Sequence, residues 1–233
     1  MATVFIQRRG EKVFISYSSF PTLSRITFPT MVYCMPKPHH VIYLPGLGDP
    51  RQKEQNTVIR TWKLFKISVQ YHPLYWTDSR PFESKLLELV AEIDEMIKSG
   101  FTVSLVGVSA GASAALNTFA MRKDAINAVA CVCGKINNLE TISAQTYQRN
   151  PSFKESIALL PQSMNALDPL SRKKILSLRP LYDGVVPILD SHIQGATNKR
   201  IPTIGHAISI AYADTIGCYQ IIRFFKLKNK LRF

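Results

Sequence analysis

Acidic residues are scarce in this chain of 233 residues: 16 Asp and Glu stand against 29 Lys and Arg, which gives a formal net charge of +13. Only 19% of the residues are charged and 46% are hydrophobic, a balance that excludes intrinsic disorder. The sequence also lacks internal repeats and low-complexity linkers, so we expect a single domain over residues 1–233. No recognisable nucleic-acid motif accompanies the positive charge, and we therefore expect no nucleic-acid partner.

Cysteines are few, and none forms a C-x-x-C pair or has a histidine at zinc-ligand spacing. We predict no metal site and expect buried, reduced thiols, with Cys131 and Cys133 on one face of a strand. The N-terminal apolar stretch is too short for a secretion signal, so the predicted location is cytoplasmic. The four cysteines are Cys34, Cys131, Cys133 and Cys218.

A long uncharged run, residues 101–121, has the length of a membrane span. Its first part is rich in β-branched residues, a Gly-Val-Ser-Ala-Gly turn interrupts it, and its second part is rich in alanine. This pattern indicates a strand, a sharp turn and a buried helix rather than a transmembrane helix.

Strand and helix patterns alternate along most of the chain, which predicts an α/β fold with a mostly parallel central sheet covered by helices on both faces. A β-hairpin is expected near the N-terminus, around residues 8–11. Residues 137–171 are polar with three prolines, which predicts a small helical cap or lid inserted in the domain. The predicted strands are 41–44, 67–71, 102–106, 126–132, 174–178 and 200–204, and the predicted helices are about 49–66, 81–98, the alanine-rich stretch after residue 109, and about 207–225.

Residues 107–111 read Gly-Val-Ser-Ala-Gly and match G-x-S-x-G between a predicted strand and a predicted helix. A serine hydroxyl is a weak nucleophile and must stand on a tight turn where a base can reach it. The alternative is a strand-to-helix turn of small residues without chemistry. The context favours Ser109 as a nucleophile.

Two further residues downstream could complete a catalytic triad. Asp183 follows the predicted strand 174–178, and His206 follows the last predicted strand. The order Ser, Asp, His is expected when the three side chains lie at the carboxyl edge of a parallel sheet. Asp190 and Asp168 are rivals for the acid. Among the other histidines, His39, His40 and His192 fit worse, whereas His72 could line a substrate pocket.

A pair of backbone N–H groups is needed to stabilise the oxyanion of an attacked carbonyl group. Ala110 supplies one of them directly after the nucleophile, and the glycine loop at residues 45–48 supplies the other through Leu47. Gly46 and Gly48 of this loop are predicted to contact substrate. A phosphate-binding loop is the competing interpretation, but the G-x-x-x-x-G-K-[ST] pattern is missing.

The chain resembles an α/β-hydrolase fold serine hydrolase over roughly residues 38–225, through PGLGD, GVSAG, DGVVP and a final GH in that order. The resemblance implies Ser109 as nucleophile, His206 as general base and acid, Asp183 as the orienting acid, and no cofactor. Pro45 stands where many family members carry histidine. Ser109 and Asp183 are only 74 positions apart, so any cap must be small.

These features predict a serine hydrolase that cleaves an ester or thioester of a small-molecule or acyl substrate through an acyl-enzyme on Ser109. A peptidase, a C–C bond hydrolase and a catalytically inactive binding protein of the same fold remain alternatives. The apolar residues of the segment 137–171 either contact an acyl group or form a packed core. These residues are Phe153, Ile157, Leu159, Leu160, Met164 and Leu167.

The last eleven residues, Arg223–Phe233, contain five basic residues and no acid. This tail is expected either to contact an anionic membrane or an acidic carrier peripherally, or to be a packed helix with a solvated basic end. The sequence leaves the oligomeric state open.

Overall fold

The computed structural model describes residues 3–9, 12–18, 33–34, 37–48 and 52–230. These residues form two compact units, Met1–Lys37 and Pro38–Phe233, each of which is described by itself. The prediction of one domain over residues 1–233 stays a prediction.

The first unit is a small antiparallel sheet in the order β1-β2-β3. Strand β1 (Thr3–Arg9) pairs with β2 (Lys12–Ser18) in a register that ends at Arg9 opposite Lys12, and β3 (Tyr33–Cys34) pairs with β2. The predicted hairpin is confirmed, although Gly10 and Glu11 of its turn lie outside the described residues.

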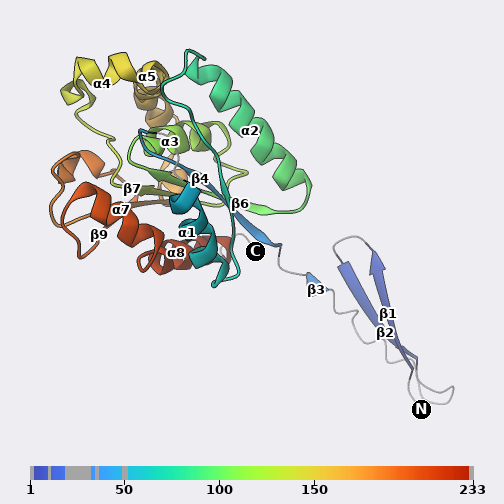
Figure 1. The fold of residues 1–233 in the computed structure, drawn as a ribbon. Helices are drawn as coiled ribbons and strands as arrows, with labels where there is room; N and C mark the ends of the chain where they lie inside the picture. The colour runs from blue at the N-terminus through green and yellow to red at the C-terminus, as the bar shows by residue number, and fades with distance from the viewer. Residues whose placement is uncertain (1–2, 10–11, 19–32, 35–36, 49–51, 231–233) are drawn as a thin grey trace. The chain divides into compact units, whose positions relative to one another are not determined.

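The second unit is built on a six-stranded parallel sheet in the order β5-β4-β6-β7-β8-β9 (Figure 1). The predicted α/β fold with a parallel central sheet is confirmed. The strands are β4 (His39–Leu44), β5 (Ser68–Tyr71), β6 (Thr102–Val108), β7 (Val129–Val132), β8 (Ile175–Arg179) and β9 (Thr197–Arg200).

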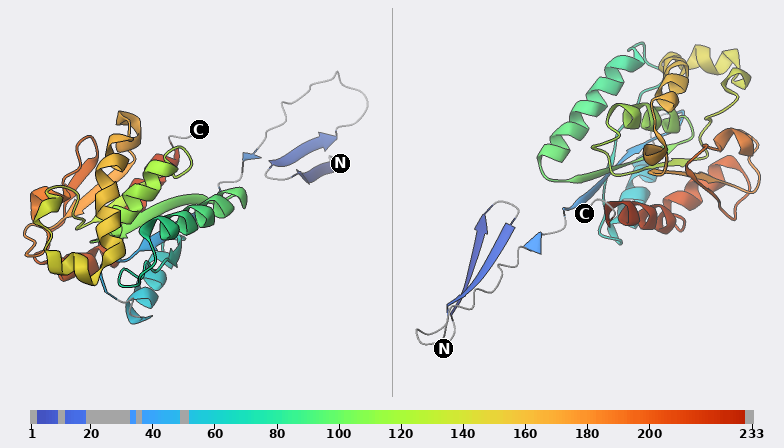
Figure 2. Two further views of the ribbon diagram at one scale, coloured as in Figure 1. Left: turned by 90° about the horizontal axis from the view of Figure 1, so that it is seen from above. Right: turned by 180° about the vertical axis from the view of Figure 1, so that it is seen from behind.

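Helices cover both faces of this sheet, as Figure 1 and Figure 2 show. Alternate residues of the inner strands face opposite sides: in β4, Ile42 and Leu44 enter one buried cluster and Val41 and Tyr43 the other. The first cluster includes side chains of α2 (Phe82–Lys98), α3 (Gly111–Met121) and α5 (Pro151–Asn165). The second includes those of α1 (Gln52–Lys63), α7 (His206–Asp214) and α8 (Cys218–Lys230).

The uncharged run 101–121 forms β6, a turn and α3, as its pattern predicted. Within the described ranges, no helix is both long and apolar enough to cross a membrane.

Two C-terminal elements differ from the sequence prediction. The last strand was predicted at residues 200–204 from their apolar pattern, and this prediction is wrong. The last strand is β9 at Thr197–Arg200, a polar strand at the edge of the sheet. The expected helix over 207–225 is two helices, α7 and α8, which separate at Thr215–Gly217. A side chain at Gly217 would clash with the Tyr212 ring, since its Cβ would lie 2.7 Å from that ring.

Residues 137–171 are largely helical, as predicted: they comprise η1 (Leu139–Thr141), α4 (Ala144–Arg149), α5 and most of α6 (Pro169–Arg172). Helix α5 packs on a face of the sheet against α2 and α3. There Ser156 Oγ lies 2.7 Å from Ser113 Oγ, and Ser152 Oγ accepts a hydrogen bond from buried Lys85 at 2.9 Å. Phe153, Ile157, Leu160 and Leu167 are buried in the first cluster, which favours the packed-core alternative.

Candidate active site

The parallel sheet brings the predicted site residues to one edge. The carboxyl ends of parallel strands meet at the same edge, so the chain leaving β4, β6, β8 and β9 converges there. Residues 45–48 follow β4, Ser109 follows β6, Asp183 follows β8, and His206 begins α7 after β9.

Ser109 occupies a strained turn between β6 and α3. Its φ of 51° lies in the left-handed region, which is uncommon for a residue other than glycine. The turn is tight: a Cβ at Gly107 would lie 2.5 Å from the Gly111 carbonyl oxygen, and one at Gly111 would lie 2.6 Å from the Pro45 carbonyl oxygen. Only glycine fits at both positions, which is the physical reason for the G-x-S-x-G pattern.

The structure brings the three predicted triad residues together. Nε2 of His206 lies 2.9 Å from Ser109 Oγ, and its Nδ1 lies 2.8 Å from Asp183 Oδ2. These two contacts match the predicted arrangement of nucleophile, base and orienting acid, which an activated serine requires.

The Asp183 carboxylate is buried but well compensated. Its side chain is 1% exposed, and Oδ1 accepts hydrogen bonds from the backbone N–H groups of Val185 at 2.8 Å and Val186 at 3.0 Å. Because backbone N–H groups of the following turn satisfy Oδ1, the other carboxylate oxygen, Oδ2, is left to accept a hydrogen bond from His206.

The segments that carry Asp183 and His206 are tied to each other by the backbone. Tyr182 and Ile204 form an isolated parallel bridge, and Gly205 N–H donates to the Tyr182 carbonyl at 2.8 Å. This pairing continues the β8–β9 contact and holds the segment of Asp183 beside that of His206.

The rival residues have other partners away from the triad. Asp190 pairs with buried Lys135, and Asp168 caps α6 through Ser171 N–H at 2.8 Å. The hydrogen bonds from Ser171, then Lys123, hold the pKa of Asp168 well below its usual range. His39 lies at the opposite end of β4, where burial lowers its pKa to about 4.

The glycine loop lies directly against the nucleophile, since a Cβ on Gly46 would lie 3.0 Å from Ser109 Cβ. Gly46, Leu47 and Gly48 all line the pocket at Ser109, and Ala110 stands at the N-terminus of α3. Among the described residues, neither the Leu47 N–H nor the Ala110 N–H has an acceptor. Two free N–H groups beside a nucleophile fit the predicted oxyanion role.

His72 is the predicted substrate-binding residue that the structure does not bring to this pocket. The Nδ1 atom of its ring lies 2.7 Å from Glu92 Oε2 on α2, and its backbone N–H donates to the Tyr43 carbonyl. It follows the edge strand β5, so it is displaced from the centre of the sheet.

Trp76 supports the site and was missed by the sequence patterns. Its indole N–H donates to the carbonyls of Gly46 at 3.1 Å and Pro45 at 3.4 Å. A trans peptide points its C=O and the following N–H in opposite directions, so holding the Gly46 carbonyl turns the Leu47 N–H the other way. No motif signals this contact, because it joins two loops that are distant in sequence.

A cavity of about 460 Å³ opens at Ser109 and His206. Residues 137–171, all of which are described, contribute nothing to its lining. Its walls are mainly aliphatic and aromatic, with Tyr43 and Asp214 as polar members; the remaining lining residues include Val58, Tyr71, Val108, Val185, Ala207, Ile210 and Ala211.

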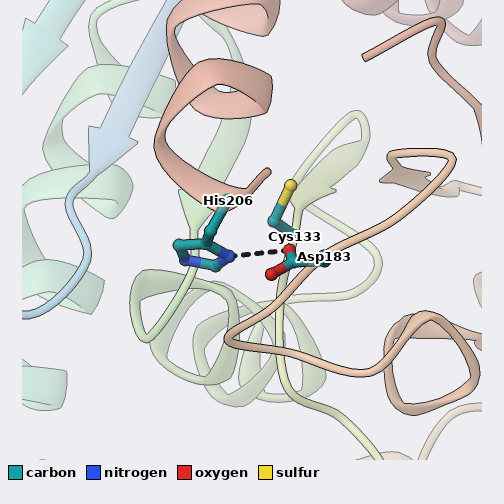
Figure 3. Close-up of side chains that lie close together, drawn as sticks. All are labelled: Cys133, Asp183 and His206. Atoms are coloured by element: carbon teal, nitrogen blue, oxygen red, sulfur yellow. Dashed lines mark hydrogen bonds and ion pairs between the residues drawn. The ribbon is translucent and has the colours of Figure 1, made fainter. Parts of the chain in front are cut away.

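Cys133 lies beside Asp183 and His206, as Figure 3 shows. The prediction that Cys131 and Cys133 share a face is wrong: Cys131 enters the first buried cluster and Cys133 the second. Cys133 comes after β7 ends, and its φ of 52° breaks the alternation of the strand. Both thiols are buried, and burial, followed by the charges of Asp183 and Asp214, raises the pKa of Cys133 to about 12.

Solved structures share this fold at low sequence identity. Est1E from Butyrivibrio proteoclasticus with bound ferulic acid is 14% identical, covering 81% of this chain and 91% of that one, with a TM-score of 0.60. MGS-MChE2, an α/β hydrolase enzyme from the metagenome of Mar Chica lagoon sediments in Morocco, is 16% identical, covering 97% and 99%, with a TM-score of 0.57. The esterase domain of a Rhodothermus marinus protein is 12% identical, covering 97% and 98%, with a TM-score of 0.57.

No protein-family model matches the sequence, and no curated protein matches it. The structural likeness therefore establishes the fold, and the chain has the α/β-hydrolase fold.

Proposed function

We propose that this protein is a serine hydrolase that cleaves an ester or thioester through an acyl-enzyme on Ser109. The observation that carries the proposal is the continuous hydrogen-bond chain from Ser109 through His206 to Asp183, on a strained turn that opens into a cavity. The esterases of the same fold are consistent with it.

In the first step, His206 Nε2 takes the Ser109 proton while Oγ forms a bond to the substrate carbonyl carbon. Negative charge develops on the carbonyl oxygen, where the N–H groups of Leu47 and Ala110 and the N-terminus of α3 stabilise it. The C–O or C–S bond of the leaving group then breaks, and His206 returns the proton to the leaving group.

In the second step, His206 takes a proton from water, and the resulting oxygen nucleophile attacks the acyl-enzyme carbonyl. The Ser109 ester bond breaks, the acid is released, and the proton returns to Ser109. Asp183 stays ionised throughout and stabilises the imidazolium that forms in each half.

The proposal is tested by fluorophosphonate labelling together with a panel of p-nitrophenyl esters and acyl-thioesters. We expect Ser109→Ala to abolish labelling and to lower kcat by at least about 10³-fold, because the nucleophile is removed. Ser99→Ala, at an exposed serine that ends α2, is the matched control and should behave as wild type. Labelling that persists in Ser109→Ala contradicts the proposal.

The substrate panel separates the remaining alternatives. The cavity has apolar walls, which favours an acyl or aryl group beside Ser109. Ferulic acid is bound to Est1E, so aryl esters belong in the panel. Peptide amides are included beside the esters and thioesters, and turnover of amides alone favours a peptidase. A protein that binds these ligands without labelling or turnover is a binding protein.

A further inference from the structure

Cys133 offers a sulfur atom to two members of the proposed triad, the buried Asp183 and the half-buried His206. One thiol sulfur, one His206 ring nitrogen and one Asp183 carboxylate oxygen all lie within 4.8 Å of one another. Figure 3 shows the Cys133 side chain next to the hydrogen bond between His206 and Asp183.

The three atoms are a suitable donor set for zinc-like cations. Zinc sites that keep an open position use three protein ligands drawn from Cys, His and Asp or Glu, with bonds of about 2.0–2.3 Å. Ligand atoms of such a tetrahedral site lie about 3.3–3.6 Å apart, so shifts of about 1 Å would complete the arrangement. The backbone of Cys133 has a left-handed conformation and stays in place during these shifts, because its N–H donates to the Leu178 carbonyl at 2.9 Å.

We propose that Cys133 Sγ, His206 Nδ1 and the Asp183 carboxylate bind Zn²⁺ or Cd²⁺ as an inhibitory ion, with water at the fourth position. The cation displaces the thiol proton, which leaves to solvent, and forms a metal–sulfur bond. On His206 the cation takes the place of the proton on Nδ1, and the ring keeps a single proton, now on Nε2.

Occupation of the site stops hydrolysis for a specific reason. With its proton on Nε2, His206 donates to Ser109 instead of accepting from it, so the nucleophile loses its base. Asp183 is withdrawn from its orienting hydrogen bond at the same time. Among the three ligands, only His206 lines the cavity, with a side chain that is 14% exposed, so the ion approaches from the His206 side.

Only the loss of hydrolysis rests on the proposed function, so cation binding is measured separately. Co²⁺ serves as the spectroscopic probe, since a thiolate–Co²⁺ bond gives a charge-transfer absorption that oxygen and nitrogen ligands do not give. We expect this band in the wild type and in Ser109→Ala, which keeps the three ligands. We also expect Zn²⁺ to inhibit the wild type reversibly, with activity restored by a chelator.

Cys133→Ala should remove the band and raise the half-inhibiting Zn²⁺ concentration by at least about tenfold. Cys131→Ala is the matched control: it removes another buried thiol of the same segment, from the opposite face of the sheet, and should keep both the band and the inhibition. Cys133→Ser gives a second test with little change in volume.

Absence of the band in the folded wild type at saturating Co²⁺ overturns the site whatever the variants do. Equal Zn²⁺ inhibition of wild type and Cys133→Ala also overturns it. If the protein shows no hydrolysis but the band depends on Cys133, the metal site stands and the proposed function fails.

Discussion

At the scale of single residues, two residues have left-handed backbone conformations directly after the ends of neighbouring strands. Ser109 follows β6 with a φ of 51°, and Cys133 follows β7 with a φ of 52°. Each conformation is costly for a residue other than glycine, by about 1–3 kcal/mol. The surrounding contacts hold both residues there: Ser109 N–H donates to Val132 and Cys133 N–H donates to Leu178, each on the next strand or its end.

Trp76 is the residue whose substitution tests how the oxyanion loop is held. Trp76→Phe keeps an aromatic ring beside Phe82 and Phe153 but removes the N–H that donates to Gly46. We expect kcat for a good ester to fall about tenfold with little change in KM, because the lost hydrogen bond frees the Leu47 N–H to turn away. Steady-state kinetics measure this.

Phe82→Leu is the matched control, since it disturbs the same aromatic cluster without removing a hydrogen-bond donor. It should lower the melting temperature but leave kcat close to wild type. An unchanged kcat in folded Trp76→Phe contradicts the positioning role.

At the scale of elements, helix α5 belongs to the layer of helices that covers one face of the sheet. It lies against α3 and α2 through Ser156, Asn117 and the buried Lys85, and it sends Phe153, Ile157 and Leu160 into the first cluster. An apolar helical stripe has the same sequence pattern whether it covers a substrate or a sheet. The apolar periodicity therefore predicted a helix, but it did not show whether that helix covers a substrate or the sheet.

Leu160→Ala separates these two roles. Leu160 is fully buried in the first cluster, so truncation should lower the free energy of unfolding by about 2–5 kcal/mol. KM for esters should stay within about twofold of wild type, because Leu160 does not line the cavity at Ser109. Denaturant titration and steady-state kinetics are the two measurements.

Ile210→Ala on α7 provides the contrast. Ile210 lines that cavity, so its truncation to alanine should raise KM. A large KM change in Leu160→Ala with none in Ile210→Ala would support the prediction that residues 137–171 form a lid.

At the scale of the whole molecule, the excess of positive charge is partly located on α8. Phe224 and Phe225 are buried in the second cluster, whereas Arg223 and Lys226 are exposed beside a groove formed with Phe65 and Tyr219. Of the aromatic residues in the predicted tail, Phe224 and Phe225 are thus used for packing, and Phe233 lies outside the described residues. The described part of this tail therefore offers an anionic surface its basic residues together with Leu227, whose exposed fraction is 50%.

We therefore expect sedimentation with phosphatidylserine vesicles at low salt to weaken in the double variant Arg223→Glu/Lys226→Glu. Each basic residue near an anionic surface contributes about 1 kcal/mol, and salt screens this attraction. Vesicles of phosphatidylcholine alone should bind neither protein.

Lys154→Glu/Lys173→Glu is the matched control, since it makes the same change of net charge at exposed residues elsewhere. Equal loss in both double variants assigns the effect to net charge, and equal binding of wild type and Arg223→Glu/Lys226→Glu rules out α8 as the contact.

The α/β fold could be predicted from sequence alone, and so could the three predicted triad residues that the structure brings into hydrogen-bond contact. Both depend on local patterns: alternating apolar strands and helices define the parallel sheet, and the topology sends the residues that follow its strands to one edge. Gly107 and Gly111 could be recognised because a steric requirement at a tight turn permits only one residue type.

Which distant segments meet could be seen only in the three-dimensional fold. It placed Cys133 beside Asp183 and His206, turned Trp76 onto the glycine loop, paired His72 with Glu92 and laid α5 on the sheet. These contacts join loops and helices far apart in the chain, and their geometry depends on backbone angles and packing that no local pattern encodes. The physical reason is that hydrophobic burial is non-directional, whereas hydrogen bonds and ligand distances are set by three-dimensional position.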